Sequence, residues 1–448
     1  MKSERKGTIV FFSLDALGHI NPILNIVTQL KRRGYRPIIV TARPLSKAQL
    51  LKARGFELDH CIVQQVKAEQ VAKDETKSSE EMFDEIMKPL IENFRRGVPE
   101  AYAATYMLDG ALGKHLEEVV ETHDQIEAKL KSLKPDLIVF DHVIGVPCLT
   151  TVAPRWIRLY SGFPSALYSS VNDNYSAGLG LRLDEMSKKW KDYEHSCKGP
   201  LRTKLRKYWN EKKAQDWPLE LDMSPTSPFL NFYLGPRELG LEKVPGLKPL
   251  PDVWYRLEHT LDEDSDVQAD FTIPRELSDS PGKLIYFSLG TLVTGDIDLI
   301  NRLLEILSKS PNKFVVSMGQ RHSRIKLYPN MWGDKFVDQK AILKKANLFI
   351  THGGHNSIIE AFYFGVPVIV LPVFADQFDS AQRVQDCGFG VRLSPYHCTQ
   401  GELLGCIDNL LSNTKLEQQM KTISSRLRSI KYHEIAADKI EHSLSLAV

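Results

Sequence analysis

Two stretches of the sequence gather side chains that can transfer a proton or bind a polar group. SLDALGHINP follows the apolar segment at residues 8–13 and places His19 shortly before a proline. THGGHNSIIEA, at residues 351–361, contains two histidines, two glycines, an amide, a hydroxyl and a carboxylate. Imidazole exchanges protons near neutral pH, and glycine lets a backbone approach a ligand closely. The first stretch therefore indicates acid–base chemistry, and the second indicates a ligand site.

His19 is the candidate general base. It lies in a predicted strand-to-helix turn, and the positive end of a helix disfavours an imidazolium and keeps the ring neutral. We expect that helix to begin at Pro22, with Asn21 as its N-cap. Asp141 ends another apolar segment and is the candidate partner that fixes the tautomer of His19 and stabilises its cation. The alternative is a solvated loop histidine without a catalytic role.

The THGGHNS stretch ends a predicted strand and opens a predicted helix. The unpaired N–H groups and the dipole of a helix N-terminus make an anion site, here around Asn356 and Ser357. A capping box is the alternative, because Ser357 and Glu360 fit the S-x-x-E pattern, which needs no ligand. The spacing alone does not decide between the two.

Other sites that the sequence suggests are weaker. His352 and His355 stand three residues apart without an HExxH motif or a nearby cysteine, so we expect no metal there. The DxD at Asp296 and Asp298 opens a predicted helix, where acidic side chains cap the first turn. The chain has no GxGxxG after its first strand, no GxxxxGK[ST] and no GxSxG. These absences disfavour an NAD-type enzyme, a P-loop enzyme and an α/β-hydrolase.

The composition limits the class of protein. The chain has 448 residues, enough for two or three domains, with 42% hydrophobic and 25% charged residues, as in globular proteins. Its formal net charge of +2 disfavours nucleic acid and anionic membranes as partners. The six cysteines show no CxxC pair, and no apolar run approaches the ~18 residues of a membrane span. We expect a monomer in the cytoplasm.

Alternating strands and helices must position these residues. The apolar segments TIVFFS, RPIIVTA and PDLIVFD alternate with amphipathic helical patterns, and the same rhythm restarts at KLIYFSLGT. We predict an α/β fold with two doubly wound, Rossmann-like domains that face each other across a cleft, where strand ends meet ligands. The predicted parts are a first domain at 1–245, a linker at 246–280, a second domain at 281–425 and a helix at 426–448 that packs back on the first domain.

Residues 336–382, FVDQKAILKKANLFITHGGHNSIIEAFYFGVPVIVLPVFADQFDSAQ, resemble the signature of UDP-glycosyltransferases, which transfer a sugar from a UDP-sugar to small lipophilic acceptors. GHINP and SLGT match the family's other segments in the same order. The resemblance implies a GT-B fold. It also implies that the second domain binds the donor and the first domain the acceptor.

The resemblance assigns a role to each matching position. His19 matches the family's catalytic base, and Asp141 matches its orienting acid. His355 stands where plant members have a tryptophan whose backbone mainly contacts phosphate. The implied donor-binding residues are Phe336, Val337, Gln339 and Glu360 for the uridine, Thr291, His352, Gly354, Asn356 and Ser357 for the diphosphate, and Asp376 with Gln377 for the sugar.

The resemblance predicts an inverting, metal-independent O-glycosyltransferase with no cofactor besides its UDP-sugar co-substrate. We expect UDP-glucose as the donor, because soluble members commonly use it. The expected acceptor is a lipophilic or phenolic molecule with hydroxyl groups, such as a flavonoid or a xenobiotic in detoxification. Residues 75–120 and 155–215 are expected to form its pocket. The alternatives are a UDP-sugar epimerase of similar fold and a catalytically silent UDP-sugar-binding protein.

Overall fold

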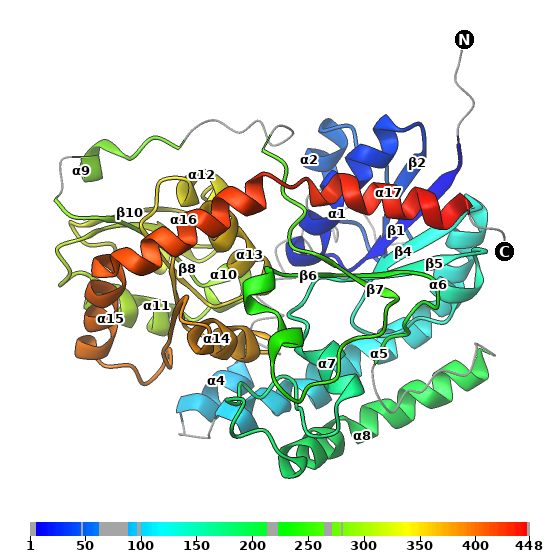
Figure 1. The fold of residues 1–448 in the computed structure, drawn as a ribbon, viewed down its shortest axis with the longest axis horizontal. Coiled ribbons are helices and arrows are strands. Elements are labelled where there is room, and N and C mark those ends of the chain that lie inside the picture. The colour runs from blue at the N-terminus through cyan, green and yellow to red at the C-terminus, as the bar shows by residue number, and fades with distance from the viewer. Residues whose placement is uncertain are drawn as a thin grey trace.

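The computed structural model describes residues 6–45, 48–61, 88–95, 100–212, 223–263, 271–278 and 281–445, which form two parallel sheets flanked by helices (Figure 1). The first sheet contains β1 (Thr8–Ser13), β2 (Arg36–Thr41), β3 (Leu58–His60), β4 (Leu137–Asp141), β5 (Trp156–Tyr160), β6 (Asn231–Leu234) and β7 (Trp254–Leu257). The second contains β8 (Leu284–Ser288), β9 (Lys313–Ser317), β10 (Met331–Asp334), β11 (Leu348–Thr351), β12 (Val368–Val370) and β13 (Gly390–Arg392).

Helices connect these strands. The helices of the first half are α1 (Leu17–Arg32), α2 (Ala48–Ala53), α4 (Lys88–Arg95), α5 (Glu100–Leu133), α6 (Cys148–Thr151), α7 (Ser165–Val171) and α8 (Lys188–Glu211). Those of the second half are α9 (Arg275–Ser278), α10 (Gly290–Val293), α11 (Ile297–Leu307), α12 (Gln339–Leu343), α13 (His355–Phe364), α14 (Gln377–Asp386), α15 (Gln400–Ser412), α16 (Thr414–Arg428) and α17 (Tyr432–Ser445). Short 3-10 turns lie at Arg237–Leu239, Leu241–Lys243 and His322–Arg324.

The strand orders place two switch points beside the strands that carry the predicted site. The first sheet has the order β3-β2-β1-β4-β5-β6-β7, and the second has the order β10-β9-β8-β11-β12-β13. The order reverses next to β1 in one sheet and next to β8 in the other. Ligands of open α/β sheets bind in the crevice that forms at such reversals. The predicted doubly wound, two-domain fold is confirmed.

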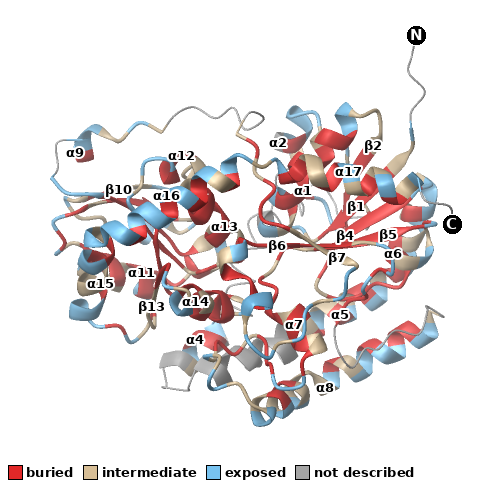
Figure 2. Ribbon diagram, viewed as in Figure 1, coloured by how far each residue is buried: buried red, intermediate tan, exposed pale blue. Residues whose placement is uncertain are grey.

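Alternation along β1 explains why helices cover both faces of the first sheet. Ile9 and Phe11 pack with α1 and α17 on one face, and Val10 and Phe12 pack with α5 and α8 on the other. Strand residues buried on both faces read as continuous apolar runs, which is typical of parallel sheets. Figure 2 shows the central strands of both sheets as buried, whereas the edge strands β3, β7, β10 and β13 are mostly only partly buried.

The last two helices join the halves of the molecule. α16 packs on α13 of the second sheet, and α17 lies against α1 of the first (Figure 1). Arg33 of α1 donates to Asp438 at 2.6 Å and to Glu441 at 2.7 Å, both on α17. The C-terminal helix therefore belongs in space to the first sheet.

The predicted linker, 246–280, begins too early. Its residues Trp254–Leu257 form β7, which pairs in parallel with β6, so that Phe232 lies opposite Tyr255. The prolines and glycines before β7 form a loop inside the first domain and not a link between domains. Residues 264–270 and 279–280 of the predicted linker lie outside the described residues.

One local prediction concerns the start of α11. Asp296 caps α11 by accepting a hydrogen bond from the Leu299 N–H at 3.2 Å, and Asp298 lies in the first turn, which confirms the capping interpretation of this DxD. The strand β10 covers Met331–Asp334 and ends before Phe336. Among the helices of the described residues, none is long and apolar enough to cross a bilayer.

Candidate active site

His19 and Asp141 meet where β1 and β4 end. Ser13, the last residue of β1, lies opposite Asp141 in the parallel register, and His19 follows in the first turn of α1. His19 Nδ1 lies 2.9 Å from Asp141 Oδ2 and 3.0 Å from the Ser161 hydroxyl oxygen. Because an ionised carboxylate only accepts hydrogen bonds, Nδ1 carries the proton and Nε2 is left with its lone pair. A group of this kind can remove a proton from a hydroxyl.

The electrostatics around His19 differ from the prediction based on the helix terminus. Burial lowers its pKa, but the charge and hydrogen bond of Asp141 raise it, and Asp376 adds to the rise, so that the pKa lies above its usual value of 6.5. The predicted effect of the helix dipole was a lower pKa. Two nearby carboxylates outweigh the effect of burial, because opposite charges at short distance favour the charged form.

The predicted start of α1 at Pro22, with Asn21 as the N-cap, is wrong. The helix begins at Leu17, so Pro22 lies inside it. Proline has no N–H, and the carbonyl four residues earlier therefore loses its helical partner. That carbonyl belongs to Gly18, and it accepts a hydrogen bond from Asn356 Nδ2 of the second domain at 2.5 Å. Pro22 inside α1 thus leaves the Gly18 carbonyl, next to His19, free to accept this hydrogen bond.

The capping-box interpretation of Ser357 and Glu360 is also wrong. α13 begins at His355 and its N-cap is Gly354, without a side-chain cap. The first N–H groups of α13 point out of the helix end, as an anion site requires. His355 turns away from that end, since its Nε2 lies 2.9 Å from the Leu234 carbonyl oxygen of β6.

Gln339, Ser357 and Glu360 come together at the start of α12 and α13. Gln339 Nε2 donates to Glu360 Oε2 at 2.6 Å and to Ser357 Oγ at 3.2 Å. Glu360 is buried, while Phe336, which precedes this cluster, has 56% of its surface exposed. Val337 is half-buried beside it. A large exposed aromatic ring beside a polar cluster suits a base and its sugar.

His352 and Thr291 lie on the loops that leave β11 and β8. These strands are neighbours, with Thr351 opposite Ser288. Burial lowers the pKa of His352 to about 4, despite a hydrogen bond to the Ser288 backbone, so the ring is neutral at pH 7. A Cβ on Gly290 would lie 2.7 Å from this ring. Thr291 is exposed in α10.

Asp376 and Gln377 begin α14, and the structure already engages both. Asp376 Oδ2 accepts from the Phe163 N–H of the first domain at 2.7 Å. Gln377 Oε1 accepts from the N–H groups of Val373 at 3.0 Å and Phe374 at 3.1 Å, which braces the preceding loop. Burial raises the pKa of Asp376, while the Phe163 N–H and His19 act in the opposite direction.

Comparisons with known proteins agree with this geometry. Residues 269–432 match the family described as "UDP-glucoronosyl and UDP-glucosyl transferase". The NDP-glycosyltransferase YjiC of Bacillus subtilis is 24% identical over 98% of this chain and 97% of its own length. The uncharacterized UDP-glucosyltransferase YojK, from the same organism, is 31% identical over 35% of this chain and 40% of its own length.

The solved structure of the glycotransferase of kitacinnamycin covers 98% of this chain and 99% of its own, with a TM-score of 0.65 and 19% identity. That likeness fixes the fold as GT-B. Residues 269–432 thus match the UDP-glycosyltransferase family, and the whole chain has the fold of GT-B glycosyltransferases. It is accordingly a glycosyltransferase that takes a nucleotide-sugar donor.

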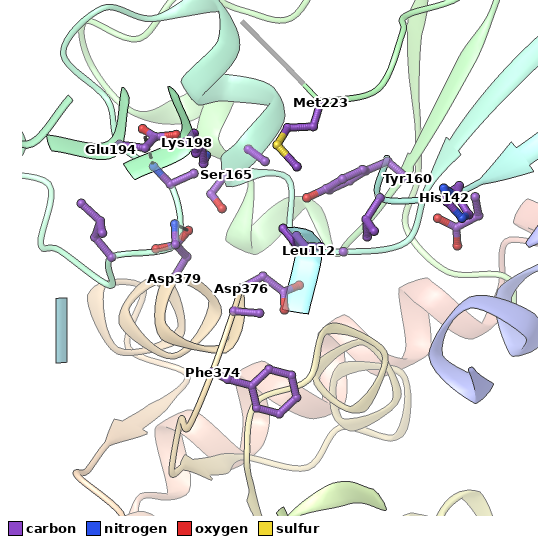
Figure 3. Close-up of a pocket in the computed structure, with 18 of the residues that line it drawn as sticks. Leu112, His142, Tyr160, Ser165, Glu194, Lys198, Met223, Phe374, Asp376 and Asp379 are labelled. Carbon is purple, nitrogen blue, oxygen red and sulfur yellow. Dashed lines mark hydrogen bonds and ion pairs between the residues drawn. The ribbon is translucent and has the colours of Figure 1, made fainter. Parts of the chain in front are cut away.

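The glycosyltransferase has a cavity of about 410 Å³ at the His19 end of the cleft. Figure 3 shows it between Asp376 and Asp379 on one side and Tyr160 and Ser165 on the other. Most of the remaining surface is apolar, and a concave apolar site with a few polar groups is typical of small-molecule pockets. Apolar lining residues include Leu112, Val143, Ala166, Leu179, Met223 and Phe374.

The predicted acceptor segments, 75–120 and 155–215, account for part of this cavity. Leu112 and the lining residues between Arg158 and Arg202 fall within them. Met223 lies in the first domain but outside both segments, and the lining residues at 374–376 and Asp379 belong to the second domain, where no part of the acceptor pocket was predicted. Residues 75–87 and 96–99 lie outside the described residues.

Two residues of the site were missed. Ser161 follows the unpredicted strand β5, and polar residues after strand ends were the signal used elsewhere in the chain. His142 lines the cavity next to Asp141, and its Nδ1–H donates to the Ile144 carbonyl oxygen at 2.6 Å. Burial lowers its pKa to about 3, so His142 is a neutral wall residue and not a second base.

Proposed function

We propose that this glycosyltransferase transfers glucose from UDP-glucose to a hydroxyl group of a small lipophilic or phenolic acceptor, with inversion at the anomeric carbon. The observation that supports it is the His19–Asp141 pair at a largely apolar cavity, with Asp376 of the donor domain at the same cavity. Binding of an aromatic or aliphatic acceptor in such a cavity is favourable, because apolar surface leaves water.

The reaction is a single displacement. His19 Nε2 takes the proton of the acceptor hydroxyl while that oxygen attacks the anomeric carbon. The bond from this carbon to the diphosphate oxygen breaks on the opposite face, and UDP leaves with the bonding electrons. Asp141 stabilises the imidazolium, and general base help of this kind contributes about 10²- to 10⁴-fold in rate.

The departing diphosphate needs positive charge or hydrogen bonds. The N-terminus of α13, together with His352 and Thr291, supplies hydrogen-bond donors where the two sheets meet. We propose that these groups act without a metal. Chelation by EDTA should then leave the initial rate unchanged.

The test is incubation with UDP-glucose and a panel of phenolic acceptors. The expected result is release of UDP with formation of a β-glucoside, identified from the anomeric proton coupling. UDP-galactose, UDP-glucuronic acid and dTDP-glucose, offered separately, determine the donor. Conversion of the UDP-sugar without acceptor would indicate an epimerase, and UDP binding without turnover would indicate a silent binding protein.

A further inference from the structure

The cavity wall at residues 176–180 belongs to the first domain but is held by a carboxylate of the second. Asp379, in the first turn of α14, accepts from the Gly178 N–H at 2.6 Å and from the Gly180 N–H at 2.9 Å, with a different oxygen for each. The Ser165 hydroxyl also bonds this carboxylate. Asp379, Ser165 and Gly178 all line the cavity, and Figure 3 shows the first two close together.

The two glycines allow this contact. Gly178 has a φ of +80° and Gly180 a φ of +60°, values that side chains disfavour. With both residues in this region, two amides point at the same carboxylate. A Cβ on Gly180 would lie 2.7 Å from the Cβ of Phe378 and 2.9 Å from Arg392 Nη1, whereas a Cβ on Gly178 would meet no atom within 4 Å.

Further hydrogen bonds hold the wall on both sides. Arg392 Nη1 donates to the Gly180 carbonyl oxygen at 2.5 Å and to Gln382 Oε1 at 2.8 Å, so the second domain binds both sides of Gly180. On the side of the first domain, the Ala177 N–H donates to Glu194 of α8 at 3.2 Å. The wall thus spans from α8 to α14.

Burial makes Asp379 depend on its hydrogen-bond partners. The residue is 5% exposed, and a buried carboxylate is unfavourable unless hydrogen bonds replace its water. Burial raises its pKa, while the bonds from Ser165, Gly178 and Gly180 act in the opposite direction. The N–H groups of Gly178 and Gly180 in the wall donate two of these hydrogen bonds. If the wall moved away from α14, water would have to replace them at the carboxylate.

We propose that Asp379 is a positioning residue that couples the donor site to the shape of the acceptor cavity. Asp376, expected to bind the donor sugar, lies one helical turn before it on α14. A shift of this turn when the sugar binds at Asp376 moves the wall at Gly178 and Gly180. The docking of the wall does not depend on the proposed function. Only the identities of the donor and the acceptor rest on that function.

Hydrogen exchange tests the docking without any activity. In Asp379→Asn, backbone amides in peptides that cover residues 176–180 should exchange about 10-fold faster, because a hydrogen bond to a charged group is lost. Asp408→Asn is the matched control, since this carboxylate lies exposed on α15, outside the hydrogen bonds described for the wall. Unchanged exchange in Asp379→Asn would overturn the proposal.

Kinetics test the coupling. Asp379→Asn should raise the acceptor KM about 10-fold and leave the UDP affinity, measured by calorimetry, unchanged. Gly180→Ala should raise the acceptor KM more than Gly178→Ala, because only the former meets Phe378 and Arg392. If Asp379→Asn lowered both the UDP affinity and the melting temperature, the role of Asp379 would be merely structural, which would contradict the proposal. If no acceptor is glycosylated by the wild type, the proposed function fails, while exchange still decides the docking.

Discussion

The turn after β1 and the turn after β11 both lie beside the reversal of strand order in their sheets but hold histidines of opposite character. His19 lies beside Asp141 and Asp376, and its pKa is raised. His352 has a backbone carbonyl as its hydrogen-bond partner, and burial lowers its pKa to about 4. The carboxylates beside His19 therefore raise the pKa of one ring, while burial lowers that of the other. The first turn suits proton transfer, and the second offers neutral donors to an anion.

The largest effect is expected from removing the base. His19→Ala should lower kcat/KM by about 10²- to 10⁴-fold, the usual contribution of a general base, and leave UDP affinity nearly unchanged. Initial rates and calorimetry measure the two quantities. The exposed His322 offers a control, since His322→Ala should retain the full rate. A fully active His19→Ala enzyme would refute the assignment of the base.

The next largest effect concerns the carboxylate that distinguishes the two turns. Catalysis needs neutral His19, so the wild-type rate should fall as the pH drops through its raised pKa. Asp141→Asn removes the main cause of the rise, so the acid limb of the kcat/KM profile should move to lower pH while the maximal rate decreases. An acid limb that stays in place would show that Asp141 does not control His19.

Glu360→Ala should weaken UDP binding about 10-fold, because the ribose hydroxyls would lose the carboxylate that is expected to accept their hydrogen bonds. Gln339 would lose an acceptor at 2.6 Å, so the melting temperature should also fall somewhat, although α13 remains capped at Gly354. Calorimetry and thermal unfolding separate these outcomes. A lower melting temperature with unchanged UDP affinity would restore the helix-stabilising interpretation of Glu360.

His352→Gln should weaken UDP affinity less, by a few-fold, because glutamine retains an N–H donor. The ratio of mutant to wild-type affinity should stay constant from about pH 5.5 to 8, since the ring is already neutral there. A ratio that rises on acidification would show that His352 binds phosphate as a cation, which would remove the contrast with His19.

The smallest effect is expected at Pro22. In Pro22→Ala, the new N–H would compete with Asn356 for the Gly18 carbonyl, so kcat should fall by about two-fold. The melting temperature should rise slightly, because α1 gains a hydrogen bond. Asn356→Ala should also lower kcat, without the gain in melting temperature, and should in addition weaken UDP binding, because Asn356 is one of the expected diphosphate-binding residues. A faster Pro22→Ala enzyme would contradict a role for this contact.

The places of the expected donor-binding residues could be predicted, because they follow apolar strands within one continuous stretch, whereas their roles rest on the family resemblance. The strands β5, β6 and β7 escaped prediction because their sequences, WIRLY, NFYL and WYRL, contain polar residues. Arg158 in β5 is only 2% exposed, donates to the Ser224 carbonyl oxygen at 2.8 Å and stacks on Tyr160. Buried polar groups satisfied by distant backbone break the apolar pattern on which strand prediction depends.

The acceptor side and the domain contacts were harder for a related reason. Asp379 meets Gly178 and Gly180, which lie about 200 positions away, and neither stretch has a pattern that points to the other. Asn356 was expected to meet only phosphate, yet it also reaches Gly18. Such contacts depend on how two domains dock, and no local periodicity encodes that geometry.

The return of the chain through α17 also constrains how the cleft can open. The chain passes between the sheets twice, from β7 to β8 and again from α16 to α17. Two connections between the domains favour rotation about the line that joins these connections over free separation of the domains. The displacement of a contact then grows with its distance from that line. In Figure 1 the passage from α16 to α17 lies in the upper half of the molecule, while α14 meets α7 in the lower half. The contact of Asp379 with Gly178 and Gly180 therefore lies away from this line, where a small rotation displaces it more than contacts near the line.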